Sequence, residues 1–200
     1  MDKHCEIEAK FRADNIGVAE FLKYLTNNHV LQLQGYKVVA GTDTYYTQGD
    51  SVVRHRHDGR RDTSVFTVKR RKSTTSIKDR HEIDLPLDAS VTIKDARAFL
   101  RMTGWVESFS IEKCSYIAHV KKDSHTACLA LYDVWDMNLP EHEQGSNRFL
   151  EVEIEKDSSC SPEQAEAILD TWIDDMRAAL DLNAPLNESL YEIYAPKPAI

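Results

Sequence analysis

The 200-residue sequence predicts an α+β fold in which antiparallel strands dominate. Residues 5–12 alternate strictly between apolar and charged side chains, which is the pattern of a strand with one charged face. Residues 31–87 carry only β-type signals, namely short β-branched and aromatic runs broken by turn residues. Helical spacing of apolar residues is clearest after Ser161. Strands therefore form most of the fold, and a few helices accompany them.

The predicted elements follow one another in chain order. Helices are expected over 15–29, 92–103 and 162–182, and strands over 5–12, several stretches of 31–87, 110–121, 126–136 and 148–156. The last helix has the clearest start, because Ser161 provides a cap, Pro162 suits the first helical position, and Gln164 completes a capping box. A long loop over 138–147 and a loose tail over 195–200 complete the prediction.

The composition is typical of one globular domain, which we expect to span residues 1–195. Hydrophobic residues make up 42% of the chain and charged residues 29%. No apolar run approaches the roughly 20 residues that span a bilayer, and the amino terminus lacks the apolar stretch of a signal peptide. We therefore expect a cytoplasmic protein without a membrane partner. The four cysteines form no C-x-x-C pair, so neither a zinc site nor a disulfide framework is predicted.

The charge distribution points to a local anion site. The net charge of -8 argues against broad binding of nucleic acid through a basic surface. Lysine and arginine are nevertheless concentrated between residues 54 and 80. Such a cluster in an acidic protein indicates a dedicated pocket for an anion.

Most predicted strands place charged side chains on one face and apolar side chains on the other. The acids on these faces are Glu6, Glu8, Glu82, Asp84, Asp133, Glu151, Glu153 and Glu155, and the bases are Lys10, Arg54, Arg56, Lys69, Arg71, Arg80 and Lys113. For any single strand, a solvated outer face explains this pattern. Two E-x-E patterns at opposite ends of the chain, with R-x-R between them, instead favour one shared charged surface.

The spacing of these charges suits a metal and a polyphosphate. Residues i and i+2 of a strand point the same way about 6–7 Å apart, so Glu6 with Glu8, and Glu151 with Glu153, can present paired carboxylates to one hard cation such as Mg²⁺ or Mn²⁺. Such a cation commonly keeps water and substrate phosphates in its shell. The bases provide opposite charge along a polyphosphate, and arginine forks onto phosphate oxygens.

In these residues the sequence resembles the CYTH superfamily of triphosphate tunnel metalloenzymes. The family includes inorganic triphosphatases, thiamine triphosphatases, class IV adenylyl cyclases and, more distantly, RNA 5′-triphosphatases. The motifs that carry the resemblance, in order over about residues 5–155, are Glu6-x-Glu8-x-Lys10, Asp43-Thr44-Tyr45-Tyr46, Val53-Arg54-His55-Arg56, Phe66-Thr67-Val68-Lys69, Arg80-His81-Glu82, Asp133 and Phe149-Leu150-Glu151-Val152-Glu153. One departure is Ser115, which stands where the family commonly has an arginine.

The resemblance implies a closed antiparallel barrel, or tunnel, of about eight strands with helices packed on the outside. It also implies hydrolysis of the terminal phosphoanhydride of a triphosphate such as tripolyphosphate or ATP, with Mg²⁺ or Mn²⁺ as cofactor. The expected metal ligands are Glu6, Glu8, Glu151 and Glu153. The expected phosphate ligands are Lys10, Arg54, Arg56, Lys69, Arg71, Arg80 and Lys113. Lys10 is also expected to act in catalysis, and either Glu82 or Asp133 is expected to orient the attacking water or to bind a second metal ion.

Three alternative functions stay open at this point. A class IV adenylyl cyclase would use the same metal to make cyclic AMP and would need a nucleoside pocket. An RNA 5′-triphosphatase would accept an RNA 5′ end as its only nucleic-acid partner. A binding module would hold nucleotide or polyphosphate without turnover. The sequence also leaves open whether the chain forms a homodimer.

Overall fold

The structure is a computed structural model that describes residues 5–71, 78–155 and 161–196, without the side chains of residues 5, 6, 69–71, 78–82, 155 and 162. The strands are β1 (Cys5–Arg12), β2 (Gln32–Gln48), β3 (Ser51–Asp58), β4 (Thr63–Arg71), β5 (Lys78–Pro86), β6 (Val106–Lys122), β7 (His125–Asp136) and β8 (Ser146–Glu155). The helices are α1 (Val18–Asn27), α2 (Ile93–Met102), α3 (Pro162–Leu180) and α4 (Leu190–Tyr194), with a 3₁₀ turn, η1 (Glu141–Glu143).

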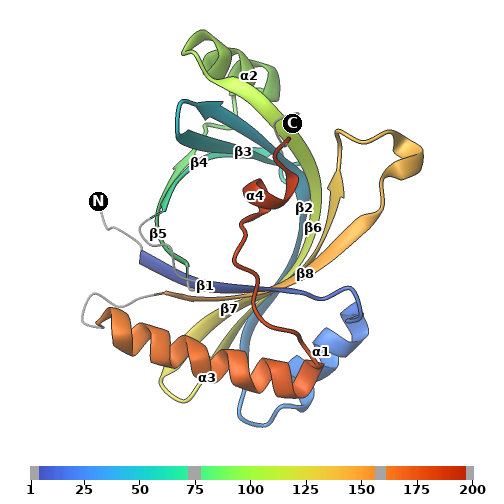
Figure 1. Cartoon of the computed structure of the whole chain (residues 1–200), viewed down its shortest axis with the longest axis vertical. Coiled ribbons are helices and arrows are strands. Elements are labelled where there is room, and N and C mark those ends of the chain that lie inside the picture. The colour runs from blue at the N-terminus through green and yellow to red at the C-terminus, as the bar shows by residue number, and fades with distance from the viewer. Residues whose placement is uncertain (1–4, 72–77, 156–160, 197–200) are drawn as a thin grey trace.

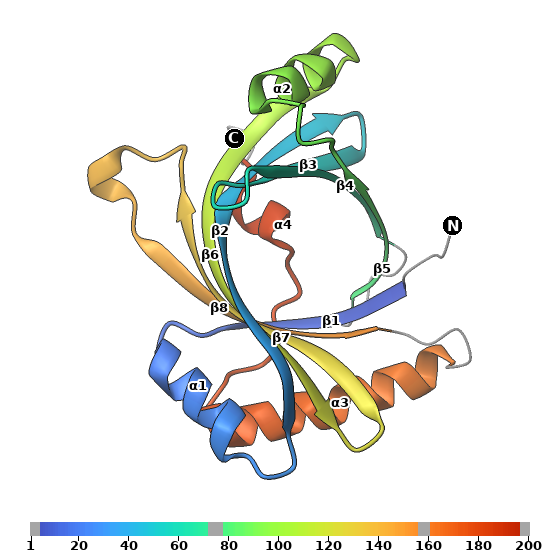
Figure 2. The same cartoon turned by 180° about the vertical axis from the view of Figure 1, so that it is seen from behind.

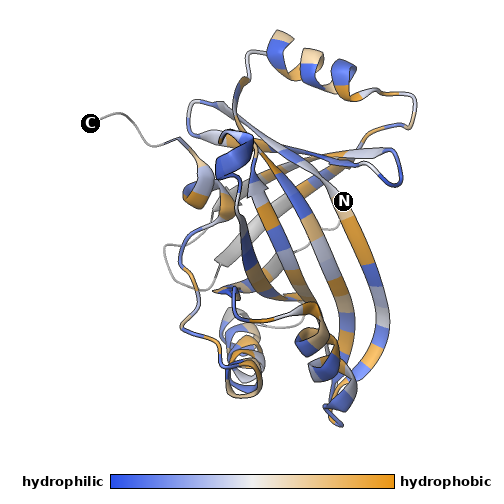
Figure 3. Ribbon diagram, turned by 90° about the vertical axis from the view of Figure 1, so that its right-hand side faces the viewer, coloured by the Kyte–Doolittle hydropathy of each residue, from blue (hydrophilic) through white to orange (hydrophobic). Residues whose placement is uncertain are grey.

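The strands pair in the order β1-β5-β4-β3-β2-β6-β7-β8, and every pairing is antiparallel. β8 pairs in turn with β1, so the strands follow one another around a closed barrel (Figure 1). The predicted α+β class and the antiparallel sheet of about eight strands are confirmed. Alternating hydrophilic and hydrophobic bands run along the strands in Figure 3, as expected for strands with two different faces.

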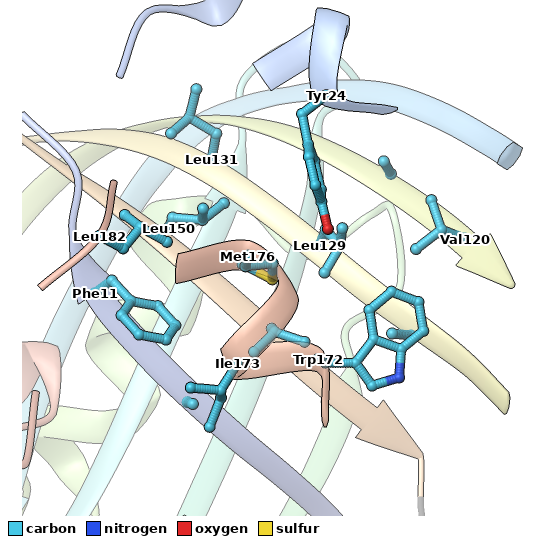
Figure 4. Packing of buried hydrophobic residues seen from close by; sticks show 14 of the residues in the cluster. Phe11, Tyr24, Val120, Leu129, Leu131, Leu150, Trp172, Ile173, Met176 and Leu182 are labelled. Atoms are coloured by element: carbon cyan, nitrogen blue, oxygen red, sulfur yellow. The ribbon is translucent and has the colours of Figure 1, made fainter. Parts of the chain in front are cut away.

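The outer face of β1, β6, β7 and β8 forms the main hydrophobic core with α1 and α3. Phe11, Leu129 and Leu150 project from the strands toward Trp172 and Met176 of α3 (Figure 4), and all five are almost completely buried. Each such side chain contributes about 1.5–3 kcal/mol by leaving water. The apolar stripe predicted for residues 162–182 therefore covers the outside of the barrel, as expected.

A second outer cluster lies under α2. Tyr46, Val53 and Phe66 from β2, β3 and β4 pack against Ala96 and Leu100 of the helix. Thr92 caps α2 through a reciprocal capping box with Asp95, and Gly104 ends the turn that follows with a φ of 88°.

A third apolar cluster lies on the inner face, at one end of the barrel. Tyr45, Phe109, Tyr132 and Phe149 belong to it, and Leu190 of α4 packs against them. In Figures 1 and 2 α4 lies within the outline of the barrel, whereas α1 and α3 lie outside it. The backbone N–H of Leu186 donates to the carbonyl of Lys10 on β1, at 2.7 Å. The segment between α3 and α4 thus connects the outer core to the inner one.

Two details differ from the sequence-based prediction. α4 was not predicted, and α1 begins after Gly17, whose N–H donates to the Glu20 carboxylate, rather than at Asn15. In the part of the chain that the structure describes, no helix is both long and apolar enough to cross a membrane.

Candidate functional site

A cavity of about 1110 Å³ opens inside the barrel. Seven of the residues predicted to form the site line this cavity: Glu8, Lys10, Arg54, Arg56, Lys113, Glu151 and Glu153. They come from β1, β3, β6 and β8, which are far apart in sequence, and the closed pairing of the strands brings them to one interior. The shared charged surface inferred from the two E-x-E patterns is therefore the inner face of the barrel.

The acidic side of the cavity is formed by β1 and β8. Glu8 lies opposite Glu153 in the strand register, and Lys10 lies opposite Glu151. Glu8 is 5% exposed and Lys10 is 2% exposed, so both charges are shielded from bulk water. The Lys10 Nζ lies 3.8 Å from Glu151 Oε1. A cation between these strands would meet carboxylate oxygens from both, with an ammonium group beside them.

The basic side of the cavity contains an ion pair between β2 and β3. Asp43 lies opposite Arg56 in register, and its two carboxylate oxygens accept hydrogen bonds from Arg56 Nε and Nη2, each at 2.7 Å. Burial by itself would raise the pKa of Asp43, but the charge and hydrogen bonds of Arg56, with Arg54 and Lys113 nearby, hold it well below its usual range. Asp43 therefore stays ionised inside the barrel.

A second arginine is held by a hydroxyl group. Arg54 Nη2 donates to Thr67 Oγ1 at 3.0 Å, and the Thr67 hydroxyl donates to Asp84 Oδ1 at 2.5 Å. Thr67 is buried on β4, and Asp84 lies opposite it in register on the neighbouring strand β5. Both arginines of the R-x-R motif are thus oriented by acidic residues, one directly and one through a hydroxyl.

Lys113 also lines this cavity, from β6. Its Nζ is 3.5 Å from the centre of the Tyr132 ring, which is the geometry of a cation–π contact. Burial, followed by the charge of Arg56, lowers the pKa of Lys113 to about 7, although Glu151 and Asp43 oppose the change. Burial, followed by Glu151, raises the pKa of Tyr132 well above its ordinary value, so the phenol stays protonated.

Five predicted site residues have side chains outside the described part of the structure: Glu6, Lys69, Arg71, Arg80 and Glu82. Their backbone positions are described. Glu6 lies opposite Arg80 across β1 and β5, and Lys69 lies opposite Glu82 across β4 and β5. Arg71 also lies opposite Arg80 in this register. Their roles stay predictions.

The expectation that Asp133 lies on the charged inner face is wrong. On β7, the side chains of Cys128 and Ala130 line the cavity, whereas Leu129 and Leu131 pack into the outer core. Asp133 has the same parity as the two leucines and forms a two-bond ion pair with Arg148, with N–O distances of 2.7 and 2.9 Å. The side chain is therefore engaged outside the barrel and does not line the cavity.

The sequence assigned no role to several residues that shape the cavity. Asp43 was noted only as part of a motif. Tyr132 was overlooked because placing Asp133 on the inner face of the strand puts its neighbour Tyr132 on the outer face. Residues 189–192 also line the cavity, and their Ser189-x-x-Glu192 pattern is a capping box that could have revealed α4. Ser115, a departure noted in the sequence, lines the cavity with an uncharged hydroxyl group.

The donor set suits a hard divalent cation in chemical type, because Glu8, Glu151 and Glu153 provide only oxygen atoms. Among the side chains that the structure describes, however, no three His, Cys, Asp or Glu residues lie close enough together to hold a metal ion. The described carboxylates therefore fit Mg²⁺ or Mn²⁺ only if Glu6, water or substrate phosphates complete the shell.

Neither a protein-family model nor a curated protein matches the sequence. Solved structures do match the fold. The PH1012 protein of Pyrococcus horikoshii OT3 aligns with a TM-score of 0.66 and 19% identity over 96% of this chain and 99% of its own. A chain of the Schizosaccharomyces pombe Mediator head module aligns with a TM-score of 0.55 and 14% identity, over 92% of this chain and 100% of its own.

The S. pombe Pct1 RNA triphosphatase also matches, with a TM-score of 0.52 and 13% identity over 91% of this chain and 87% of its own. At these low identities, the comparisons establish a shared fold and do not transfer an activity. The chain therefore has a fold found both in an RNA triphosphatase and in a chain of the Mediator head module, with a charged cavity inside its barrel.

Proposed function

We propose that the chain is a metal-dependent phosphohydrolase that cleaves the terminal phosphoanhydride of a triphosphate inside the barrel, and that the cavity acts as a triphosphate tunnel. One observation carries the proposal. Three of the predicted carboxylates (Glu8, Glu151, Glu153) and four of the predicted cations (Lys10, Arg54, Arg56, Lys113) line a single cavity, together with other charged residues, in a molecule of net charge -8. The shared fold of the Pct1 RNA triphosphatase supports the same conclusion.

The two sides of the cavity have separate tasks in this proposal. Arg54, Arg56 and Lys113 bind phosphate oxygens and neutralise the charge that develops on the bridging oxygen. Glu8 and Glu153, with Glu6 and Glu151, hold Mg²⁺ or Mn²⁺, which supplies Lewis-acid activation of the phosphate when bound. Lys10 balances the charge of Glu151, which lies 3.8 Å away. Lys69, Arg71 and Arg80 keep their predicted role as phosphate ligands in this proposal, and Glu82 its predicted role of orienting the attacking water.

The direct test is product analysis with purified protein. Tripolyphosphate, ATP, thiamine triphosphate and a 5′-triphosphorylated RNA are each incubated with Mg²⁺ or Mn²⁺. We expect orthophosphate from at least one of them, and EDTA should abolish its release. Cyclic AMP with pyrophosphate would instead identify a cyclase. The absence of any product would contradict the hydrolase assignment.

A matched pair of variants tests whether the cavity is the site. Glu8→Gln removes a buried carboxylate of the acidic side, and we expect turnover to fall by at least about 100-fold because metal binding is weakened. Glu112→Gln removes an exposed carboxylate of β6 that does not line the cavity. Equal turnover in both variants, with thermal unfolding unchanged, would place the chemistry elsewhere.

A second candidate, a non-catalytic module that binds nucleotide or polyphosphate, is favoured by one observation. The described carboxylates do not by themselves gather into a metal site. Calorimetric titration with tripolyphosphate, with and without metal, separates the two candidates. Tight binding that does not need metal, together with no product, would support the binding module.

A further inference from the structure

The two-bond contact between Asp43 and Arg56 suggests a role that goes beyond burying a charge. Asp43 is 1% exposed, and both of its carboxylate oxygens accept hydrogen bonds from one edge of the guanidinium group. A two-bond contact fixes the plane of the group as well as its position. The Arg56 side chain is 33% exposed and lines the cavity. The acid is thus hidden while the arginine that it holds faces the interior.

The surroundings of Asp43 exclude a more obvious role for it. A buried carboxylate in a candidate metalloenzyme is first considered as a metal ligand. Here both oxygens of Asp43 are already engaged by Arg56, and Arg54 and Lys113 are also close enough to influence its charge. A divalent cation would have to displace Arg56 and approach further positive charge. Asp43 therefore belongs with the basic wall and not with the acidic side of the cavity.

We propose that Asp43 is a positioning residue, which orients Arg56 so that its guanidinium meets a substrate phosphate in a fixed geometry. This inference rests on the proposed function of the cavity and adds the residue that orients one of its phosphate-binding side chains. An unrestrained arginine side chain loses rotamer entropy when it is ordered. The contact with Asp43 imposes much of that order during folding, before any substrate binds.

The inference predicts a specific kinetic result. Asp43→Asn replaces one acceptor with an N–H donor that faces the guanidinium, so the two-bond contact is lost while the shape of the side chain is kept. We expect kcat/KM for the best triphosphate to fall by about 100-fold, because a misplaced binding group costs about that much. Arg56→Lys keeps the positive charge and loses the planar fork, and it should show most of the same loss.

A double variant separates positioning from a general effect on the fold. If Asp43 acts through Arg56, then Asp43→Asn should cause no further loss of kcat/KM in a protein that already carries Arg56→Met. Independent losses that multiply would overturn the inference. If Asp43→Asn alone does not fold, Arg56→Lys and the double variant still decide the question, with thermal unfolding as the check on folding.

The chain also contains a matched control. Asp133 and Arg148 form the same type of two-bond contact on the outer face, with N–O distances of 2.7 and 2.9 Å. Asp133→Asn should lower the unfolding temperature while kcat/KM stays within about twofold of the original protein. Comparable kinetic losses in Asp43→Asn and Asp133→Asn would contradict the positioning role.

Failure of the inference and failure of the proposed function give different results. If the unmodified protein neither turns over nor binds a triphosphate, both are wrong. If it binds tripolyphosphate without turnover, the same variants are compared by their dissociation constants, and the same loss of about 100-fold is expected for Asp43→Asn. If the protein is active and Asp43→Asn is equally active, only the positioning role is wrong.

Discussion

Two aspartate–arginine pairs in this molecule have nearly the same geometry and opposite surroundings. Asp43 with Arg56, and Asp133 with Arg148, each lie directly opposite in antiparallel register and each form two short hydrogen bonds. The first pair faces the charged cavity, and the second lies on the outer face of the barrel. The contact alone therefore does not indicate function. What differs is which side of the sheet the pair occupies.

The second pair has a structural task that its other contacts make clear. Besides Asp133, Arg148 donates to the carbonyl of Ile16, and its backbone N–H donates to Asp14. Hydrogen bonding to Asp133 raises the pKa of Arg148, so this guanidinium stays charged. The pair thereby ties β7 and β8 to the loop before α1. The contact between Asp43 and Arg56 inside the barrel has the charged groups of Arg54 and Lys113 as neighbours instead.

Removing each arginine should give the largest contrast. Arg56→Met removes a phosphate ligand and leaves Asp43 buried without its partner, so we expect affinity for tripolyphosphate to fall about 100-fold and stability to fall by about 3 kcal/mol. Arg148→Met should cost about 1–3 kcal/mol of stability and leave affinity unchanged, because its pair is partly exposed. Calorimetric titration and urea unfolding measure the two quantities. Equal losses of affinity would show that the two faces do not differ in function.

Lys113 should make binding to the inner face depend on pH. Its pKa in the folded protein is lowered to about 7, chiefly by burial, so the amine loses its positive charge as pH rises above 7. A bound polyanion favours the charged form, and the affinity for tripolyphosphate should therefore fall by up to about tenfold for each pH unit above 7. Titrations at pH 8 in two buffers of different ionisation enthalpy should detect proton uptake on binding.

The control for this prediction is Lys113→Met, which removes the titrating group. Its affinity should be lower at pH 6.5, and its proton uptake at pH 8 should be smaller than in the unmodified protein. Arg148→Met, which changes the outer face, should keep the full uptake. Uptake that is the same with and without Lys113 would assign the pH dependence to another group.

The smallest expected effect concerns His55, which lies between Arg54 and Arg56 in sequence and points to the opposite face of β3. There it is 2% exposed and stacks edge-on against Phe66. Burial, with the charges of Arg97 and His57, lowers the pKa of His55 to about 4 from its ordinary 6.5. As pH falls, His55 therefore takes up a proton in the unfolded chain before it does so in the folded chain. The stability that the neutral His55 contributes to the folded protein is lost as pH falls from 6.5 toward 4.

We expect His55→Leu to remove this acid sensitivity. The difference in unfolding free energy between pH 7 and pH 5 should shrink by on the order of 1 kcal/mol in the variant. Urea unfolding at the two pH values measures the difference, and His119→Leu on β6 serves as a control histidine. An unchanged pH dependence would show that His55 titrates normally in the folded protein.

Much of the site could be predicted because its strands alternate cleanly. In β1 and β8, Glu8, Glu151 and Glu153 occupy one face while Ile7, Leu150 and Val152 occupy the other, and the structure places these sets in the cavity and in the outer core respectively. Local polarity reports the face of a strand when only one face is charged. The error at Asp133 arose because the inner face of β7 lacks this signal: Ala130 and Tyr132 line or border the cavity there and carry no charge.

The sequence by itself determined which elements form, apart from α4, and which side of most strands is charged, because alternation and capping depend on neighbours in the chain. Only the tertiary structure decided that the charged faces meet inside one barrel, that α4 packs against the inner aromatic cluster, and that Asp43 holds Arg56. Those contacts join residues whose distance in space depends on register and strand order. No local pattern encodes that distance, and only the pairing of all eight strands brings the charges together.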